Sequence, residues 1–249
     1  MSGPKSNVMT PKWIPNGWEL PPEILERLGR KVGRQRAMEE GDHLLILLHA
    51  PPKPGQDERE ARVFWRKPDG SWSTNTKGKG AKAILEHIAE YQSLIDALEA
   101  QEDAAKSADD YFAVLDQATP LARASRNMHA ALQQARDLIP EDQEIVSCRD
   151  EAYNCERSAD LLVQDVKNGF DLHVAKQTEL MTKSGHAMAV AGHRLNTLVA
   201  LLFPTATIAA RLGMNVPIGL ENTPGAFVGA IVVGLALGFG VKGWLDRPV

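Results

Sequence analysis

The chain has 249 residues, a formal net charge of -4, and 28 lysines and arginines scattered among 32 acidic residues. Because no basic face or long basic run appears, we expect no nucleic-acid partner. In a helix, Cys148 and Cys155 would lie roughly 10 Å apart along the axis, beyond the reach of a disulfide. We therefore expect them to be small buried packing residues and not a bridge or a metal pair.

Residues 1–79 are predicted to form a small α/β region. The segment 21–37, PPEILERLGRKVGRQRA, is expected to be a short helix rich in cations. The apolar run 43–50, HLLILLHA, is typical of a buried strand, and segments 59–67 and 71–74 flank a Pro-Asp-Gly turn as a hairpin does. The chain contains no phosphate-binding glycine loop, nucleophile elbow or zinc-ligand spacing, so we expect that it is not an enzyme.

Residues 80–193 are predicted to be helical. One amphipathic helix covers about 80–101, where apolar residues recur at spacings of three and four: Ile84, Ile88, Tyr91, Ile95 and Leu98. A second helix covers about 104–138 and is expected to break or kink at Pro120. The sequence Pro-Glu-Asp at 140–142 then opens a third helix, because proline suits a first turn and acidic side chains there complement the helix dipole.

The third helix carries a regular apolar seam, formed by Ile145, Cys148, Ala152, Cys155, Ala159, Leu162 and Val166. Such a seam is typical of a coiled coil, so it requires either self-association or packing on neighbouring helices. Beyond it the same face turns polar at His173 and Gln177. No proline follows Glu141 until Pro204, which predicts one continuous helix over 141–212, about 105 Å long.

Two apolar runs, 195–212 and 224–245, end the sequence. Each reaches the roughly 17 residues that a transmembrane helix needs. The alternative is a buried hairpin in a soluble core, but glycines in the second run would weaken a soluble helix and would allow close packing in a membrane. These glycines are Gly225, Gly229, Gly234, Gly238 and Gly240. We therefore predict that 194–249 forms two transmembrane helices joined by an external loop, 213–224.

The charges that flank the two runs predict their orientation. Lys183 and Arg194 precede the first run, Lys242 and Arg247 close the second, and the connecting loop contains no lysine. The positive-inside rule places both termini in the cytoplasm, with the chain in the cell (inner) membrane. Arg211 lies on the wrong side for this rule, at a helix end where a long side chain can reach the membrane interface.

The arrangement resembles the CorA-type divalent cation channels. The residues that carry the resemblance are Gly213-Met214-Asn215 at the outer end of the first span, Pro204 eleven positions before Asn215, Glu221 six positions after it, and the closing Gly-Trp-Leu at 243–245. The resemblance is specific from about residue 149 onward and only architectural before it. The sequence departs from the family at Leu212, where the family has tyrosine, and at Leu220, where it has proline.

The resemblance implies an α+β membrane protein with a small cytoplasmic α/β region, a long helical stalk and two C-terminal transmembrane helices. It implies a homo-oligomer in membrane lipid, with the pentamer as the family's form. The transported ion would be Mg2+, since relatives that transport zinc often have Ile or Val where Met214 stands. Other Zn2+, Co2+ or Ni2+ transport on the same fold is an alternative, and a non-conducting, membrane-anchored coiled-coil scaffold is another.

The resemblance also implies roles for individual residues. A ring of Asn215 amides, set by Gly213 and Met214, would bind the hydration shell of Mg2+ as the outer selectivity filter. Glu221 would concentrate cations at the pore mouth, Leu195 and Phe203 would line the inner pore, and Asp150 would help to bind a regulatory Mg2+ between subunits.

Ordinary roles remain open for each of these residues. Asn215 has the alternative role of a helix C-cap, Glu221 that of a solvated loop charge, and Leu195 and Phe203 that of lipid-facing or interhelical packing residues. His186 and His193 share a helix face, but two histidines without a third ligand are more typical of an interfacial stalk than of a zinc site. Arg211 lies four positions before Asn215, so a cation pore requires the helix to end near Leu212 or Arg211 to be neutralised.

Overall fold

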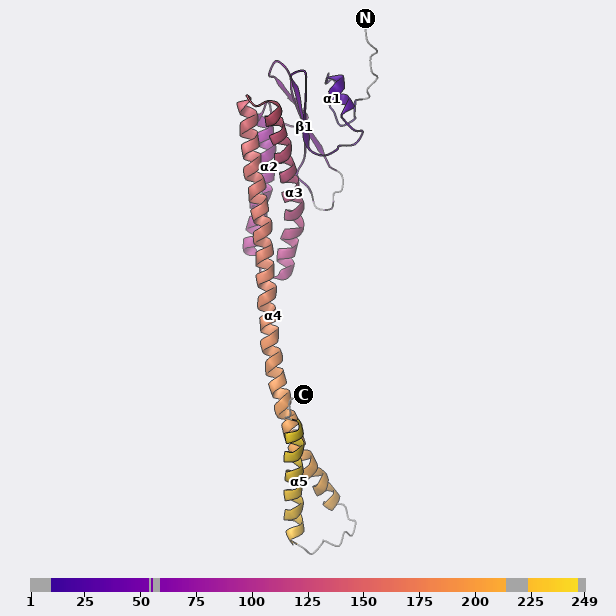
Figure 1. The fold of residues 1–249 in the computed structure, drawn as a ribbon, viewed down its shortest axis with the longest axis vertical. Coiled ribbons are helices and arrows are strands. Elements are labelled where there is room, and N and C mark those ends of the chain that lie inside the picture. Colours follow the sequence, from indigo (N-terminus) through magenta and orange to yellow (C-terminus); the bar gives the residue numbers. More distant parts are fainter. Residues whose placement is uncertain (1–9, 54, 56–58, 214–223, 246–249) are drawn as a thin grey trace. The chain divides into compact units, whose positions relative to one another are not determined.

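The computed structural model describes the chain except for residues 1–9, 54, 56–58, 214–223 and 246–249 (Figure 1). The chain divides into two compact units, Met1–Val174 and Ala175–Val249. Helix α4, which covers Gln143–Gly213, contributes residues to both units.

The N-terminal unit contains a four-stranded antiparallel sheet in the order β1-β2-β3-β4. Its strands are Arg36–Glu40 (β1), His43–His49 (β2), Ala61–Arg66 (β3) and Trp72–Thr74 (β4). The buried strand and the hairpin predicted from the sequence are confirmed as β2 and as the pair β3–β4. Gly41 and Asp42 both have positive φ, 55° and 65°, so a two-residue turn with the twist that suits a hairpin joins β1 to β2.

The predicted cationic helix over 21–37 is wrong in its extent. Only Pro22–Glu26 forms a helix (α1), and β1 begins at Arg36. Gly29 and Gly33 weaken a helix across this segment. Pairing with β2 buries Ala37 and Met38 almost completely, which a short surface helix would not do.

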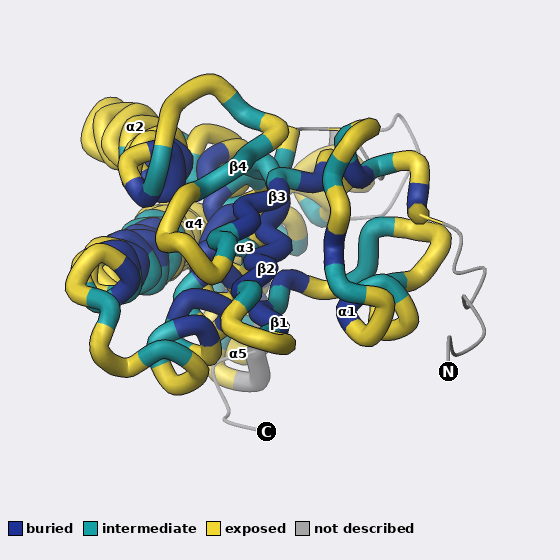
Figure 2. The backbone as a smooth tube through the Cα atoms, turned by 90° about the horizontal axis from the view of Figure 1, so that it is seen from above, coloured by how far each residue is buried: buried dark blue, intermediate teal, exposed yellow. Residues whose placement is uncertain are grey.

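Both faces of the sheet are covered (Figure 2). On one face, Leu44, Ile46 and Leu48 of β2 belong to the core that the sheet shares with the long helices. On the other face, Leu45 and Leu47 pack in a second cluster with α1 and the segment before it. Because both faces of β2 are buried, its sequence is a continuous apolar run without alternation.

Three helices lie side by side over the sheet: α2 (Lys82–Ala104), α3 (Ala108–Leu138) and the first part of α4 (Figure 1). The five predicted core residues of α2 are all buried, which confirms that amphipathic helix. Ser107 caps α3, since its hydroxyl accepts from the Asp110 N–H at 3.2 Å and the Asp110 carboxylate accepts from the Ser107 N–H at 2.9 Å.

Of the break or kink expected at Pro120, the break is wrong, because α3 continues through this residue. A proline inside a helix removes one hydrogen bond and forces a local adjustment. Burial of Ala118 and Leu121 on either side of Pro120 offsets that cost by holding α3 against the core.

The apolar seam of α4 is buried inside the chain. All seven seam residues are at most 2% exposed and belong to the same core as the buried faces of α2 and α3. The Cys148 thiol lies 3.8 Å from the carbonyl oxygen of Ala81, and burial raises the pKa of Cys148 and of Cys155 to about 12. Of the two explanations for the seam, packing on neighbouring helices is therefore the one that holds, and both cysteines are buried and free.

Candidate functional site

The C-terminal unit pairs the end of α4 with α5, which covers Pro224–Leu245. A Cβ atom on Gly234 would lie 2.8 Å from the Thr205 Cα, and one on Gly238 would lie 2.8 Å from the Leu201 Cα. Since residue numbers rise along α4 as they fall along α5, the two helices form an antiparallel hairpin with touching backbones. The close packing expected of the glycines is confirmed at these two positions; Gly225, Gly229 and Gly240 have no such neighbour among the described residues.

Pro204 gives this contact an unusual hydrogen-bonding pattern. The helix α4 continues through Pro204, which has no N–H to donate to the carbonyl of Ala200. That carbonyl oxygen lies only 3.2 Å from the position a Gly238 Cβ would take. The Thr205 hydroxyl is buried at the same contact and has no hydrogen-bond partner among the described residues. In the hairpin, the Ala200 carbonyl therefore lacks the N–H donor that a regular helix would supply. The nearby Thr205 hydroxyl lacks a hydrogen-bond partner among the described residues.

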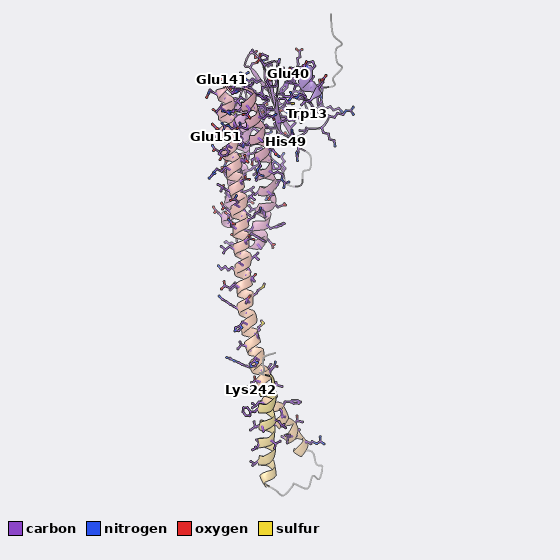
Figure 3. All side chains as sticks on the ribbon, viewed as in Figure 1. Trp13, Glu40, His49, Glu141, Glu151 and Lys242 are labelled. Atoms are coloured by element: carbon purple, nitrogen blue, oxygen red, sulfur yellow. The ribbon has the colours of Figure 1, made fainter. Side chains whose placement is uncertain are left out.

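The outward faces of the hairpin are apolar and exposed (Figure 3). The exposed side chains are Leu195, Leu198, Val199, Leu202, Phe203, Val228, Ile231, Val232, Val233, Leu237 and Phe239. Among the described residues one helix, α4, is long and apolar enough to cross a membrane, and none of its apolar window is buried within the chain. In α5 the apolar run with described side chains is shorter, Ile231–Gly240. An apolar surface of this kind is typical of lipid-facing or subunit-facing helices.

The predicted filter lies mostly outside the described residues. Met214, Asn215 and Glu221 are in that part of the chain, and Gly213 is the last residue of α4. Leu195 and Phe203 are 61% and 68% exposed. Most of each side chain is therefore left uncovered by the described residues of the chain.

The remaining predicted residues lie on exposed faces of α4. Arg211 is exposed, two residues before the last described residue of α4, and forms no ion pair with a described residue. The Asp150 carboxylate is more than half exposed and lies 3.0 Å from the guanidinium of Arg149. His186 and His193 are exposed, and no group of three or more potential metal ligands occurs among the described residues.

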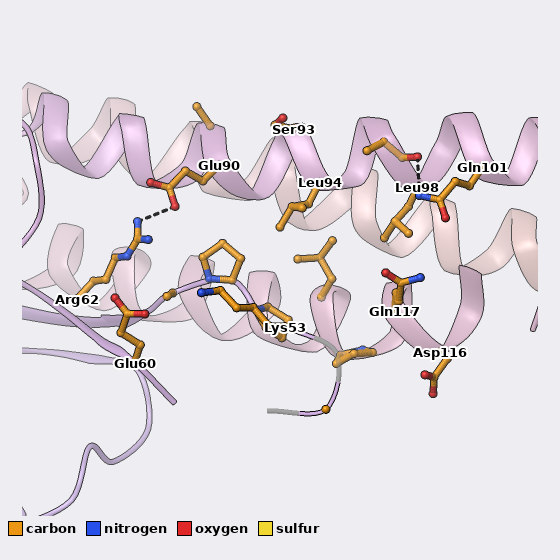
Figure 4. Close-up of a pocket in the computed structure, with 18 of the residues that line it drawn as sticks. Lys53, Glu60, Arg62, Glu90, Ser93, Leu94, Leu98, Gln101, Asp116 and Gln117 are labelled. Carbon is orange, nitrogen blue, oxygen red and sulfur yellow. Dashed lines mark hydrogen bonds and ion pairs between the residues drawn. The ribbon is translucent and has the colours of Figure 1, made fainter. Parts of the chain in front are cut away.

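The N-terminal unit contains a groove that the sequence did not predict. It has a volume of about 1040 Å³ and lies between the segment that follows β2 and the surfaces of α2 and α3 (Figure 4). Arg62 lies at one end, where its guanidinium is 2.8 Å from the Glu90 carboxylate. The sequence signals are Pro51 and Pro52 after a buried strand and Pro120 within a helix, all of which line the groove.

Behind Arg62 lies a buried histidine. The Nδ1 atom of His87 is 3.2 Å from Nη1 of Arg62, so the histidine accepts from the guanidinium. Burial, followed by the positive charge of Arg62, lowers the pKa of His87 to about 3. His87 is therefore neutral at physiological pH, and its other nitrogen has no hydrogen-bond partner among the described residues.

No protein-family profile matches the sequence, and no curated protein matches it. Among solved structures, the full-length CmaX protein aligns with a TM-score of 0.58 at 15% identity, covering 92% of this chain and 83% of that one. The ZntB cytoplasmic domain from Vibrio parahaemolyticus aligns with a TM-score of 0.53 at 10% identity, covering 64% of this chain and 80% of that one. The chain therefore shares the fold of these two structures, a small sheet combined with a long helix.

The CorA magnesium transporter from Methanocaldococcus jannaschii is also similar, at 14% identity over 86% of this chain and 78% of that one. Its TM-score is 0.38, which is too low to support an argument about this chain.

Proposed function

We propose that the chain is a CorA-like membrane transporter or channel for divalent cations, with Mg2+ as its ion. In this proposal it forms a homo-oligomer, taken to be a pentamer, in which α4 and α5 of each subunit span the cell membrane and both termini lie in the cytoplasm. The observation that carries the proposal is the fold shared with full-length CmaX over 92% of the chain, together with a C-terminal hairpin whose outward faces are apolar.

The coordination chemistry of Mg2+ explains why amide oxygens would suit the proposed filter. Mg2+ loses its water slowly and prefers octahedral oxygen coordination. Neutral amide oxygens of Asn215 from several subunits would accept hydrogen bonds from the hydrated ion and bind it weakly enough for release. Glu221 would raise the cation concentration at the mouth. The proposal also requires α4 to end near Leu212, so that Arg211 is directed away from the Asn215 ring.

The scaffold alternative loses its main support. Its basis in the sequence was the apolar seam of α4, which an intermolecular coiled coil would use. In the structure this seam is covered by α2 and α3 of the same chain. The exposed faces of the C-terminal hairpin still need covering, and a lipid-embedded oligomer would cover them.

Ion flux into liposomes tests the proposal. Purified protein should admit Mg2+, and Asn215→Ala should abolish that flux while the oligomer stays assembled, because the amides bind ions and do not hold subunits. Asn222→Ala, the same change in the same loop, is the matched control and should conduct as wild type does. Parallel measurements with Zn2+, Co2+ and Ni2+ identify the ion. Absence of flux for all four ions would favour a non-conducting scaffold, and normal flux in Asn215→Ala would reduce Asn215 to a helix cap.

A further inference from the structure

The middle of the groove in the N-terminal unit is lined by apolar side chains. Its apolar lining comes from Leu94 and Leu98 of α2, from Leu121 of α3, and from the prolines at positions 51, 52 and 120. Leu94 is 41% exposed, so an aliphatic occupant would remove apolar surface from water.

One end of the groove offers mainly hydrogen-bond acceptors. The amide nitrogens of Gln101 and Gln117 donate to carbonyls of their own helices, those of Ala97 and Ala113, at 3.3 and 3.2 Å. Their amide oxygens are left for the groove (Figure 4). Asp116 also lines this end of the groove, and its carboxylate pairs with no described cation.

The other end is charged, with an excess of carboxylates. The Arg62 guanidinium is compensated by Glu90 at 2.8 Å. Glu60 pairs with no described cation, and Glu86 makes only a long 3.9 Å contact with Lys82. Lys53 is the second cation that lines the groove. The whole lining therefore has two cations and four carboxylates, those of Glu60, Glu86, Glu90 and Asp116.

We propose that this groove binds a linear aliphatic polyamine. Ammonium groups only donate hydrogen bonds, which matches an acceptor-lined end. Methylene segments match the apolar middle, and the carboxylates at both ends match positive charge. Glu90 and Gln101 are eleven residues apart on α2, about 16 Å along its axis, so the occupant is a long chain with an amine at each end. The inference stands apart from ion transport, because every residue it uses lies in the N-terminal unit.

Calorimetric titration of the full-length protein in detergent tests the proposal. Spermine should bind at least about tenfold more tightly than butane-1,4-diamine at constant ionic strength, because the short diamine cannot reach both ends of the groove. Asp116→Asn should weaken spermine binding about fivefold, the range of an exposed ion pair. Lys53→Met removes a competing cation and should tighten binding.

Two variants separate a built site from general attraction to an acidic protein. Ala97→Trp fills the groove without changing its charge and should abolish spermine binding; Ala97 is exposed, so the helix accommodates the ring. Glu99→Gln removes an exposed carboxylate of α2 outside the groove and should leave affinity unchanged. Absence of spermine binding, an equal loss in Glu99→Gln and Asp116→Asn, or undiminished binding in Ala97→Trp with an unchanged circular dichroism spectrum, would each overturn the proposal.

Discussion

At the residue scale, the pair of Arg62 and His87 joins the surface of the N-terminal unit to its core. Arg62 is partly exposed; it forms an ion pair with Glu90 and a hydrogen bond with the buried Nδ1 of His87. The ring of His87 packs edge-on against Tyr91, whose hydroxyl donates to the His49 carbonyl at 2.9 Å. A proton on His87 would therefore place a second positive charge beside Arg62 inside the core, where no carboxylate contacts it among the described residues.

This arrangement predicts a pH-dependent stability. The pKa of His87 is about 3 in the folded protein and near 6.5 in the unfolded chain, so between these values the unfolded chain binds the additional proton. Stability should therefore fall as pH is lowered from about 6.5 towards 3, by up to about 1.4 kcal/mol per pH unit. Urea unfolding followed by tryptophan fluorescence between pH 4.5 and 7.5 measures this slope.

Substitution identifies the histidine responsible. His87→Phe keeps a ring in the core and should reduce the slope, with the remainder coming from His49, whose pKa is also lowered by burial. His186→Phe changes an exposed histidine of α4 and should keep the wild-type slope. An unchanged slope in His87→Phe would show that this residue does not carry the effect.

At the element scale, the buried faces of the long helices α2 and α4 were predicted well because their signals are local. The stripe of α2 and the seam of α4 follow from spacings of three and four, which a helix places on one face whatever surrounds it. The strand β1, Arg-Ala-Met-Glu-Glu, has no such local signal, because its partner β2 supplies the burial. The groove was not predictable either, since it forms where segments near residues 51, 62, 94 and 117 meet in space.

The hairpin of the C-terminal unit gives a prediction for two glycines. Gly238→Ala would place a methyl group 2.8 Å from backbone atoms of Leu201, which cannot move aside as a flexible side chain can. We expect a loss of stability of about 1–3 kcal/mol, seen as a lower midpoint in thermal unfolding of the detergent-solubilised protein.

The control for this change lies on the same helix. Gly240→Ala meets no described atom within 4 Å and should leave the midpoint unchanged or raise it, because alanine favours helix over glycine. Equal midpoints for Gly238→Ala and Gly240→Ala would contradict the contact between α4 and α5. The sequence placed glycines in this helix, but which of them touch α4 depends on the register of the two helices.

At the scale of the whole molecule, the proposed orientation can be tested with cysteine labelling. Cys148 and Cys155 are buried, and burial raises the pKa of each thiol to about 12, so both should stay unreactive in the folded protein. A Thr223→Cys variant should therefore react with a membrane-impermeant maleimide on intact cells, and Ser71→Cys should react only after lysis. The opposite pattern would reverse the proposed topology, and labelling of the unmodified chain would show that the native thiols are accessible.

Pro204 makes the stiffness of α4 uneven. The carbonyl of Ala200 has lost its helical donor, and the carbonyl of Phe203 also accepts from the Thr207 hydroxyl at 2.8 Å, a contact that favours bending. Bending of a regular helix is distributed over all its turns, whereas in α4 the turn at Pro204 bends most easily. The backbone of Gly238 lies against this weak turn and offers no side chain to brace it. Flexure of α4 should therefore behave as a joint at one level and not as a gradual curve.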